Sequence, residues 1–403
     1  LCLIHCMGGT DCHHGNLIAN GEQPVVIDTE TLVHPLPQIE RSQDSVVIDS
    51  DAPHLAQKQL KESVLKTLLL HQWGISQSDR LDVDFSGLGG VEGQEISSFK
   101  LKNINTDGMN VEFEVSILTE ANMPTIDGIA LSPKDYLADL VVGFKQMYRF
   151  LLTHREDILA ADSPLNSFVN QKARYVFRST RIYFGILENS YQPNLLRYGV
   201  DRSIGLDVLS RAFLAEKEKP IYWELLDAEL QSMEELDIPF FTSNSSEDFL
   251  SLANGTVIPE IFAEPSYDRV LWQIENLSET DLKQQIDIIY SSFYSRFAQE
   301  PNPVSSKSID RVLASEIDPI LPSEEIVTQA IAIAQELEQR AIGAVDGSMT
   351  WIGLGHRFNN QGFQLQGLGY SLSDGSAGVA LFFASLFRVT RDSQWCELAL
   401  RTL

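Results

Sequence analysis

The sequence is poor in cysteine and in long apolar runs, and each shortage excludes a class of protein. Its 403 residues include four cysteines, none in a C-x-x-C pair, and three lie within the first dozen residues. This usage favours neither a disulfide framework nor a zinc site, and it fits reduced thiols in a cytoplasmic protein. No stretch approaches the roughly 18 to 20 uncharged apolar residues of a membrane-spanning helix, so we expect no membrane span.

Basic residues are also scarce. Lysine and arginine total 30 against 56 aspartates and glutamates, which gives a formal net charge of −26. Such a balance argues against non-specific nucleic-acid binding and against docking on anionic membranes. Apolar residues make up 43% and charged residues 21%, so we expect a globular chain rather than a disordered one.

The length predicts two domains, because 403 residues exceed the size of one ordinary domain. Residues 301–322 mix proline, serine and charge without periodicity, and we predict that they link a first domain, 1–300, to a second, 323–403. Leu1 is not an initiator methionine, and both ends read as interrupted helices. We therefore interpret the sequence as an internal fragment.

Hydrophobic periodicity predicts the main elements. Residues 25–27 form a short apolar strand, and alternation over 97–117 predicts a β-hairpin. Ser132-Pro133 opens a helix, and we expect mostly helix from there to about residue 300. Its aromatic residues Tyr136, Phe144 and Tyr148 are expected in the core.

The second domain is predicted to begin with a helix that Ser323 caps. The glycine-rich segment 353–378 then leads into another apolar helix at 379–387. The apolar stripe of the first of these helices comprises Ile326, Ala330, Ile333, Leu337 and Ala341.

Five polar residues near the start carry the chemical signal. The pattern is Asp11-x-His13-x-x-Asn16, followed after a further twelve residues by Asp28-x-Glu30 at the end of the apolar strand. A phosphotransferase needs one carboxylate to orient the attacking hydroxyl, and a second carboxylate and an amide oxygen to hold Mg²⁺ against the nucleotide phosphates. Asp11, Asp28 and Asn16 fit these roles in that order.

The spacing favours an atypical kinase. The step from Asp11 to Asn16 equals that of the kinase catalytic loop, while Thr29-Glu30 replaces the F-G of the D-F-G motif. Only ten residues precede Asp11, so the glycine-rich cover and its lysine would lie upstream, and we expect this fragment alone to be inactive. Small-molecule kinases of the aminoglycoside and choline type share the pattern, and a purely structural role for these residues, such as capping a turn, stays open.

Longer matches resemble the dehydratase domain of class II lanthipeptide synthetases, the LanM family, and then its LanC-like cyclase domain. Gly15 and Gly108 depart from the family pattern, which often has Glu and a second Asp at these positions. The matching segments are Thr10–Ala19, Pro24–Pro35, Asn105–Met109, Gly143-Phe144, Arg174-x-x-x-Arg178-x-Thr180-x-x-Tyr183, Asp237-Ile-Pro-Phe-Phe241 and, for the cyclase, Ser373–Ala384.

The resemblance implies an α+β, mostly helical fold: an atypical, lipid-kinase-like C-lobe followed by the first helices of an α/α barrel. It implies ATP- and Mg²⁺-dependent phosphorylation of Ser and Thr in a ribosomally made precursor peptide, then phosphate elimination to dehydroalanine or dehydrobutyrine. By similarity, elimination falls to Arg174 and Thr180, with Arg178 in support. The alternative is that Arg174, Arg178 and Arg181 form an exposed basic helix face.

Other roles are left more open. We expect His13 to brace the loop by hydrogen bonds, and Glu30 to orient either the loop or the Mg²⁺ ligands. In the cyclase family Zn²⁺ activates peptide thiols for ring closure; its ligands would lie beyond Leu403, and Cys396 matches none of them. A catalytically dead peptide-binding scaffold is the non-enzyme alternative, and the oligomeric state is not predictable.

Overall fold

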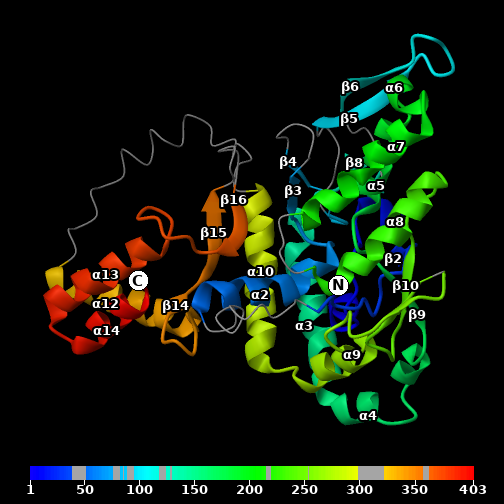
Figure 1. Ribbon diagram of the computed structural model, residues 1–403. Coiled ribbons are helices and arrows are strands. Elements are labelled where there is room, and N and C mark those ends of the chain that lie inside the picture. The colour runs from blue at the N-terminus through cyan, green and yellow to red at the C-terminus, as the bar shows by residue number, and fades with distance from the viewer. Residues whose placement is uncertain are drawn as a thin grey trace. The chain divides into compact units, whose positions relative to one another are not determined.

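The computed structural model divides the chain into two compact units (Figure 1), residues 1–40 with 66–286 and residues 41–65 with 287–403. The grouping of 41–65 with the second unit was not indicated by the sequence. Of the predicted linker, 301–322, only Pro322 lies within the described residues. These are 1–38, 51–75, 82–84, 86–88, 95–117, 124–127, 129–214, 219–252, 254–297, 322–356 and 363–403.

The first unit begins with a buried helix and a small hairpin. Gly21 takes a positive φ of 59° in the turn between the two strands. Asp28 follows the second strand by two residues, so the predicted strand is confirmed with its bounds shifted. These elements are α1 (Cys2–Cys6), the 3-10 helix η1 (His14–Asn16), β1 (Leu17–Asn20) and β2 (Gln23–Val26).

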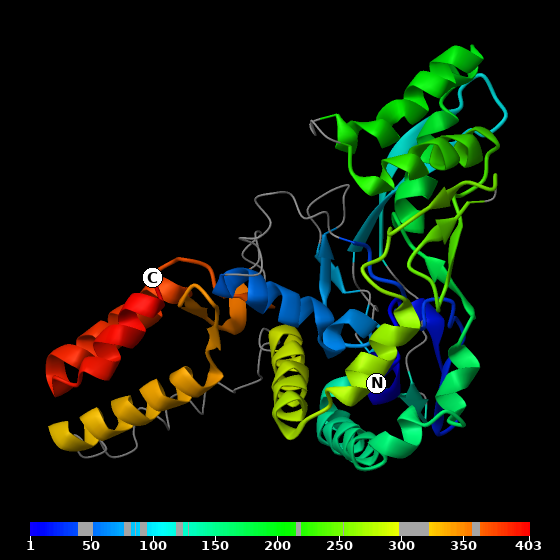
Figure 2. The same ribbon diagram turned by 60° about the horizontal axis from the view of Figure 1, so that its bottom comes forward.

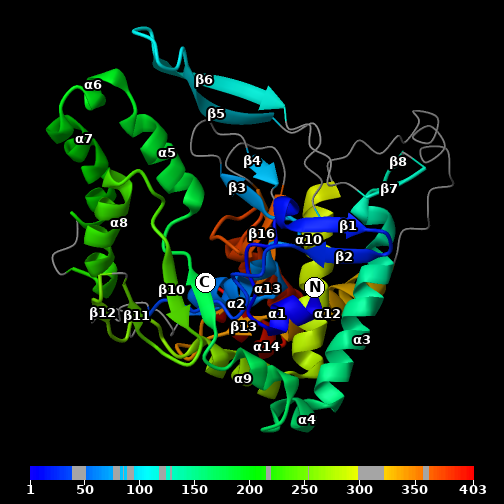
Figure 3. The ribbon, with the colours of Figure 1, turned by 90° about the vertical axis from the view of Figure 1, so that its right-hand side faces the viewer.

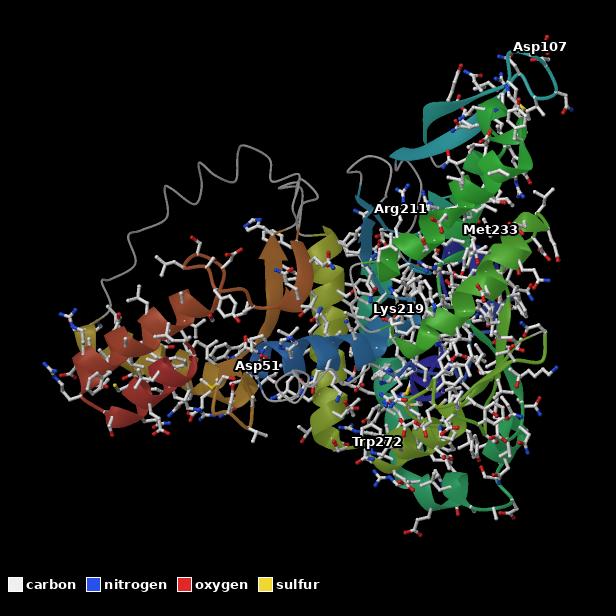
Figure 4. All side chains as sticks on the ribbon, viewed as in Figure 1. Asp51, Asp107, Arg211, Lys219, Met233 and Trp272 are labelled. Carbon is white, nitrogen blue, oxygen red and sulfur yellow. The ribbon has the colours of Figure 1, made fainter. Side chains whose placement is uncertain are left out.

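The predicted long hairpin is confirmed as β5 (Glu95–Lys102) and β6 (Asn110–Ile117). Asn103 and Asn105 take left-handed backbone angles in its turn, a conformation that asparagine tolerates. Figure 4 marks the tip of this hairpin with Asp107. Shorter pairs in this part of the chain are β3 (Trp73–Ile75) with β4 (Asp82–Asp84) and β7 (Thr125–Ile126) with β8 (Ile129–Ala130).

The helix predicted after Ser132-Pro133 is confirmed as η4 (Pro133–Tyr136) running into α3 (Leu137–Thr153). Phe144 and Tyr148 are buried, as predicted. The prediction for Tyr136 is wrong, because this side chain is 44% exposed. Tyr136 belongs to a 3-10 turn, which has three residues per turn instead of 3.6. Its side chain therefore does not line up with the side chains that α3 buries.

The prediction of mostly helix up to residue 300 is wrong in part, because this region also contains a four-stranded antiparallel sheet. Its strand order is β12-β11-β10-β9. Figure 3 shows β9 and β10 side by side. Inward residues such as Tyr175, Phe241 and Leu250 form one core with Phe262. The strands are short, so their alternation covers too few residues to stand out. They are β9 (Lys172–Tyr175), β10 (Phe241–Asn244), β11 (Leu250–Ser251) and β12 (Val257–Ile258).

Helices make up the rest of this unit. A second core joins Tyr183, Leu206, Leu209, Phe213 and Met233 between them. Two of the further helices cross the unit boundary: η3 (Val64–Thr67) begins in the second unit, and α10 (Glu279–Phe297) runs into it. The others are α4 (Arg155–Leu159), η5 (Pro164–Phe168), α5 (Thr180–Ser190), α6 (Pro193–Leu196), α7 (Gly199–Leu206), η6 (Asp207–Phe213), η7 (Ile221–Glu224), α8 (Leu225–Glu234) and α9 (Ser266–Glu275).

The second unit packs α12, α13 and α14 side by side (Figure 2). Phe383 stacks on Trp395 and contacts Trp351 at a tilt in its core, and the Trp351 Nε1–H donates to the Leu337 carbonyl at 2.7 Å. Its elements are α2 (Ala52–Glu62), α12 (Ser323–Arg340), β13 (Ile342–Gly343), β14 (Met349–Thr350), β15 (Ile352–His356), β16 (Phe363–Gly367), α13 (Ser376–Thr390) and α14 (Ser393–Arg401).

Two expectations for this unit need correction. Ser323 is the first helical residue and Pro322 precedes it as the N-cap, without a side-chain capping bond. Ile326 and Ile333 are both more than half exposed, while Ala330 and Leu337 pack on the core. The sequence made no prediction of strands in the glycine-rich segment 353–378, which overlaps the antiparallel pair β15 and β16.

None of the helices within the described ranges is long and apolar enough to cross a membrane.

Candidate functional site

The hairpin β1–β2 gathers Asp11, Asn16 and Asp28. Leu17 pairs with Val26, and beyond that pair the Ile27 N–H donates to the Asn16 carbonyl at 3.0 Å. The Asn16 side-chain amide donates through Nδ2 to the Asp11 carbonyl at 2.9 Å. A local hairpin therefore brings the two ends of the 18-residue segment 11–28 together, and Asn16 bonds to both Asp11 and Ile27.

Asp11 holds a strained backbone with φ of 59°, in the left-handed region that only a few residue types tolerate. The preceding carbonyl, that of Thr10, accepts a bond from the Thr31 hydroxyl at 2.7 Å. Burial raises the pKa of Asp11 above its ordinary value; His13 and Arg174 oppose this, and Asp28 and Glu30 add to it. These five groups lie close enough to influence one another electrostatically.

His13 braces the loop from within. Its Nδ1 accepts the Gly15 N–H at 3.0 Å and so caps η1, which leaves Nε2 to carry the proton when the ring is neutral. The His13 backbone also forms an antiparallel bridge to Ser86.

Two segments, one at Thr67 and one at 84–87, pack against the loop that carries Asp11. The Cys12 N–H donates to the Thr67 carbonyl at 3.0 Å, and a Cβ added at Gly87 would lie 2.5 Å from the Cys12 carbonyl oxygen. Beside Gly87, the Ser86 N–H and hydroxyl donate to Asp84 at 3.0 and 2.6 Å. The second carboxylate oxygen of Asp84 lies 2.6 Å from Nδ1 of His71, and both side chains of this pair are fully buried.

Strand β9 delivers Arg174 to the same region. The Arg174 N–H donates to the Glu30 carbonyl at 2.9 Å, and the guanidinium Nη1 pairs with the Glu30 carboxylate. Nη2 donates to the Thr180 hydroxyl at 2.8 Å, at the first residue of α5. Arg174 thus connects Glu30 and Thr180, although they are far apart in the sequence.

Arg178 has a different set of partners. Its Nε donates to Glu229 at 2.7 Å, and its Nη2 to the Leu209 carbonyl at 3.2 Å. The Tyr183 hydroxyl donates to the same Glu229 carboxylate at 2.6 Å. Arg174 lies on a strand and Arg178 in the following turn, so the alternative of one exposed basic helix face is wrong.

The charge balance of the site suits a cation. Burial raises the pKa of the Cys12 thiol, and Asp11 and Asp28 raise it further. The cluster around Asp11 holds three carboxylates, those of Asp11, Asp28 and Glu30, and one guanidinium, that of Arg174. The Asp28 Oδ1 accepts the Glu30 N–H at 3.1 Å, and Asn16 uses only its amide nitrogen toward Asp11. The second carboxylate oxygen of Asp28 and the amide oxygen of Asn16 therefore stay suited to Mg²⁺, which often takes only one or two protein ligands beside phosphates.

A closed protein-only metal site is a separate matter. Within the ranges that the structure describes, no group of three or more His, Cys, Asp and Glu side chains is arranged to hold a metal ion. Cys2, Cys6, Cys12 and Cys396 form no disulfide in the structure.

Residues 1–244 match the family described as Domain of unknown function (DUF4135). The chain belongs to the DUF4135 family. The match includes every candidate site residue from Asp11 to Thr180, as well as Glu229.

One curated relative extends the comparison beyond the DUF4135 region. The "Lacticin 481/lactococcin biosynthesis protein LcnDR2" of Lactococcus lactis subsp. lactis is 23% identical over 390 residues, covering 94% of this chain and 39% of the relative. The chain therefore spans about two fifths of the length of this relative. DUF4135 is the dehydratase region of LanM proteins, so the resemblance predicted from the sequence is confirmed.

Sequence reasoning missed the partners that hold this DUF4135 site in shape. Glu229, the pair His71–Asp84 and Gly87 carried no local pattern that distinguishes them from surface residues or loop glycines. Phe240 lay inside a recognised segment, but its position against Arg174 depends on the pairing of β9 with β10.

Proposed function

We propose that this chain carries the dehydratase centre of a class II lanthipeptide synthetase. The substrate is a ribosomally made precursor peptide. Its Ser and Thr hydroxyls are first phosphorylated from ATP, and phosphate is then eliminated to leave dehydroalanine or dehydrobutyrine. Membership of the DUF4135 family and the similarity to a lacticin 481 biosynthesis protein support this assignment.

In the first step Asp11 accepts a hydrogen bond from the Ser or Thr hydroxyl and takes up its proton as the oxygen attacks. Asn16 and Asp28 would offer an amide oxygen and a carboxylate oxygen to Mg²⁺, while His13 and Glu30 keep the loop in place. Bound ATP would supply the phosphoryl group, with ADP as the leaving group, and Mg²⁺ would neutralise phosphate charge. Leu17 and Ile18, which follow Asn16, contribute to the lining of a cavity of about 240 Å³, which we assign to the nucleotide base.

In the second step a base removes the Cα proton, the electron pair forms the Cα=Cβ bond, and the Cβ–O bond breaks with phosphate as the leaving anion. The Arg174 guanidinium binds the departing phosphate through charge-assisted hydrogen bonds. Thr180 accepts a hydrogen bond from Nη2 of Arg174 and so orients the guanidinium. Thr180 is itself exposed to solvent.

One observation carries this proposal: Arg174 bonds at once to Glu30, two residues after Asp28, and to Thr180. This contact supports a single site in which the groups proposed for phosphoryl transfer lie beside those proposed for phosphate removal. A peptide phosphorylated there would need no second domain for elimination.

The second unit is proposed as the beginning of the cyclase, with α12, α13 and α14 as the first helices of an α/α barrel. In the complete domain Zn²⁺ would activate peptide cysteine thiols for attack on the dehydrated residues. Cys396, on α14, is not proposed as a zinc ligand.

The test uses the full-length gene product and its precursor peptide, followed by mass spectrometry. Asp28→Asn should stop phosphorylation, whereas Arg174→Ala and Thr180→Ala should accumulate a phosphopeptide about 80 Da heavier than the unmodified peptide. Unchanged dehydration in all three variants would defeat the proposal. Release of a phosphorylated small molecule would instead indicate a small-molecule kinase, and peptide binding without turnover a scaffold.

A further inference from the structure

The sheet face that carries Arg174 also carries an exposed aromatic ring. Residues on β9 and β10 alternate between faces, and Arg174 pairs with Thr242 on the face opposite the buried core. Two residues before Thr242, and therefore on the same face, Phe240 is 60% exposed. Single exposed aromatic residues are common, so its exposure alone says little.

The position of the ring is more specific than its exposure. The Arg174 Cζ lies 5.2 Å from the centroid of the Phe240 ring, within the range of a cation–π contact. Glu30 and Thr180 bond the edge of the same guanidinium through Nη1 and Nη2. Three neighbours thus restrain Arg174: two bond its nitrogen atoms, and the third sets an aromatic ring against its central carbon.

The surroundings strengthen this contact. The Arg174 side chain is only 17% exposed, and its Nε is shielded from water without a hydrogen-bond partner in the described part of the chain. A cation with reduced hydration gains more from an aromatic face than one in bulk water. The backbone also fixes the ring, because Pro239 is buried and Phe241 is paired in the sheet.

We propose that Phe240 is a positioning residue for phosphate elimination. The ring holds the Arg174 guanidinium in the plane set by Glu30 and Thr180 and excludes water from one of its faces. Phosphate leaving the peptide then meets an oriented cation rather than a mobile one. This inference rests on the proposed function, and it concerns the second step alone.

The experiment compares Phe240→Leu and Phe240→Tyr in the full-length gene product. Phosphorylation of the precursor peptide and elimination from a purified phosphopeptide are measured separately. Leucine keeps apolar bulk but has no π face, so elimination should become about two- to fivefold slower through kcat, with KM for the phosphopeptide unchanged. Tyrosine keeps the π face and should restore the wild-type rate. Phosphorylation should be unchanged in both.

Two controls make the result specific. Phe150→Leu removes another half-exposed phenylalanine, on α3, and should change neither step. Arg174→Ala tests the proposed function itself by accumulating phosphopeptide.

The possible failures can be told apart. If Arg174→Ala accumulates phosphopeptide while Phe240→Leu eliminates at the wild-type rate, the inference on Phe240 is overturned and the proposed function stands. Equal slowing of both steps in Phe240→Leu, or no restoration by tyrosine, also overturns it, because the ring would then act only through the fold. If Arg174→Ala dehydrates the peptide normally, the proposed function fails and the inference fails with it.

Discussion

Arg174 and Glu30 are joined twice, through a backbone hydrogen bond of 2.9 Å and through their side-chain ion pair. The two residues are 144 positions apart in the chain. The backbone bond attaches β9 to the segment that follows Asp28, and the ion pair then aims the guanidinium. A substitution at Glu30 should therefore change the orientation of the Arg174 guanidinium.

Glu30→Gln should slow elimination from a purified phosphopeptide, because a neutral amide holds the guanidinium less firmly than a carboxylate does. The same change in an Arg174→Lys background should have a smaller additional effect. A double-mutant cycle on the elimination rate is expected to give a coupling of about 0.5–3 kcal/mol. Glu156→Gln, at an exposed position on α4, is the matched control, and additive effects at Glu30 and Arg174 would contradict the coupling.

Arg178 should matter for stability, because it is the cationic partner of the fully buried Glu229. Arg178→Met should reduce the free energy of unfolding by about 3–5 kcal/mol, since it leaves a buried carboxylate without a counter-charge. Arg178→Met combined with Glu229→Leu should recover much of this loss, because no charge is left buried. Urea denaturation measures both, and equal losses in the single and double variants would refute the explanation.

Gly87→Ala should displace the loop that carries Asp11. The new Cβ would lie 2.5 Å from the Cys12 carbonyl oxygen and 2.9 Å from the Leu69 side chain, and the backbone oxygen cannot move aside cheaply. We expect about 1–3 kcal/mol of destabilisation and a lower phosphorylation rate. Gly143→Ala on α3, where nothing lies within 4 Å, should instead stabilise its helix by up to about 1 kcal/mol. Similar melting temperatures for the two variants would show that Gly87 has room.

Stability should fall on mild acidification. Burial, with a further contribution from Lys66, lowers the pKa of His5 to about 3 and that of His34 to about 4. The unfolded chain binds these protons near pH 6.5 and the folded chain does not, so the stabilisation present above pH 6.5 is lost as pH falls toward 4. Each histidine should contribute a slope of up to about 1.4 kcal/mol per pH unit.

Urea denaturation at several pH values between 7.5 and 5 measures this slope. His5→Gln and His34→Gln should each flatten it, because glutamine takes up no proton. An unchanged slope in both variants would mean that these imidazoles do not control the pH dependence.

The sequence was sufficient for the parts of the site that a local hairpin assembles. Asp11, Asn16 and Asp28 lie within one short segment, so their spacing alone indicated a shared site. The partnership of Arg174 with Thr180 came from family resemblance, and its connection to Glu30 required the tertiary structure. Residue spacing cannot express a contact between segments that only the fold brings together.

The remaining errors have physical causes. The sheet β9–β12 was missed because its strands have two to four residues, too few for a period of two to stand out. No sequence pattern marks Glu229 on α8 as buried. Its burial is possible because Arg178 and Tyr183 donate hydrogen bonds to its carboxylate. Tyr136 was assigned to the core because an α-helical repeat was extended through a 3-10 turn.

The positive φ of Asp11 has a practical consequence for mutagenesis. Asparagine and glycine adopt this backbone shape readily, whereas alanine does so only at a conformational penalty. Asp11→Asn therefore isolates the loss of the carboxylate, and Asp11→Ala combines that loss with a distorted main chain. Comparing the two separates what the side chain does from what its unusual geometry requires.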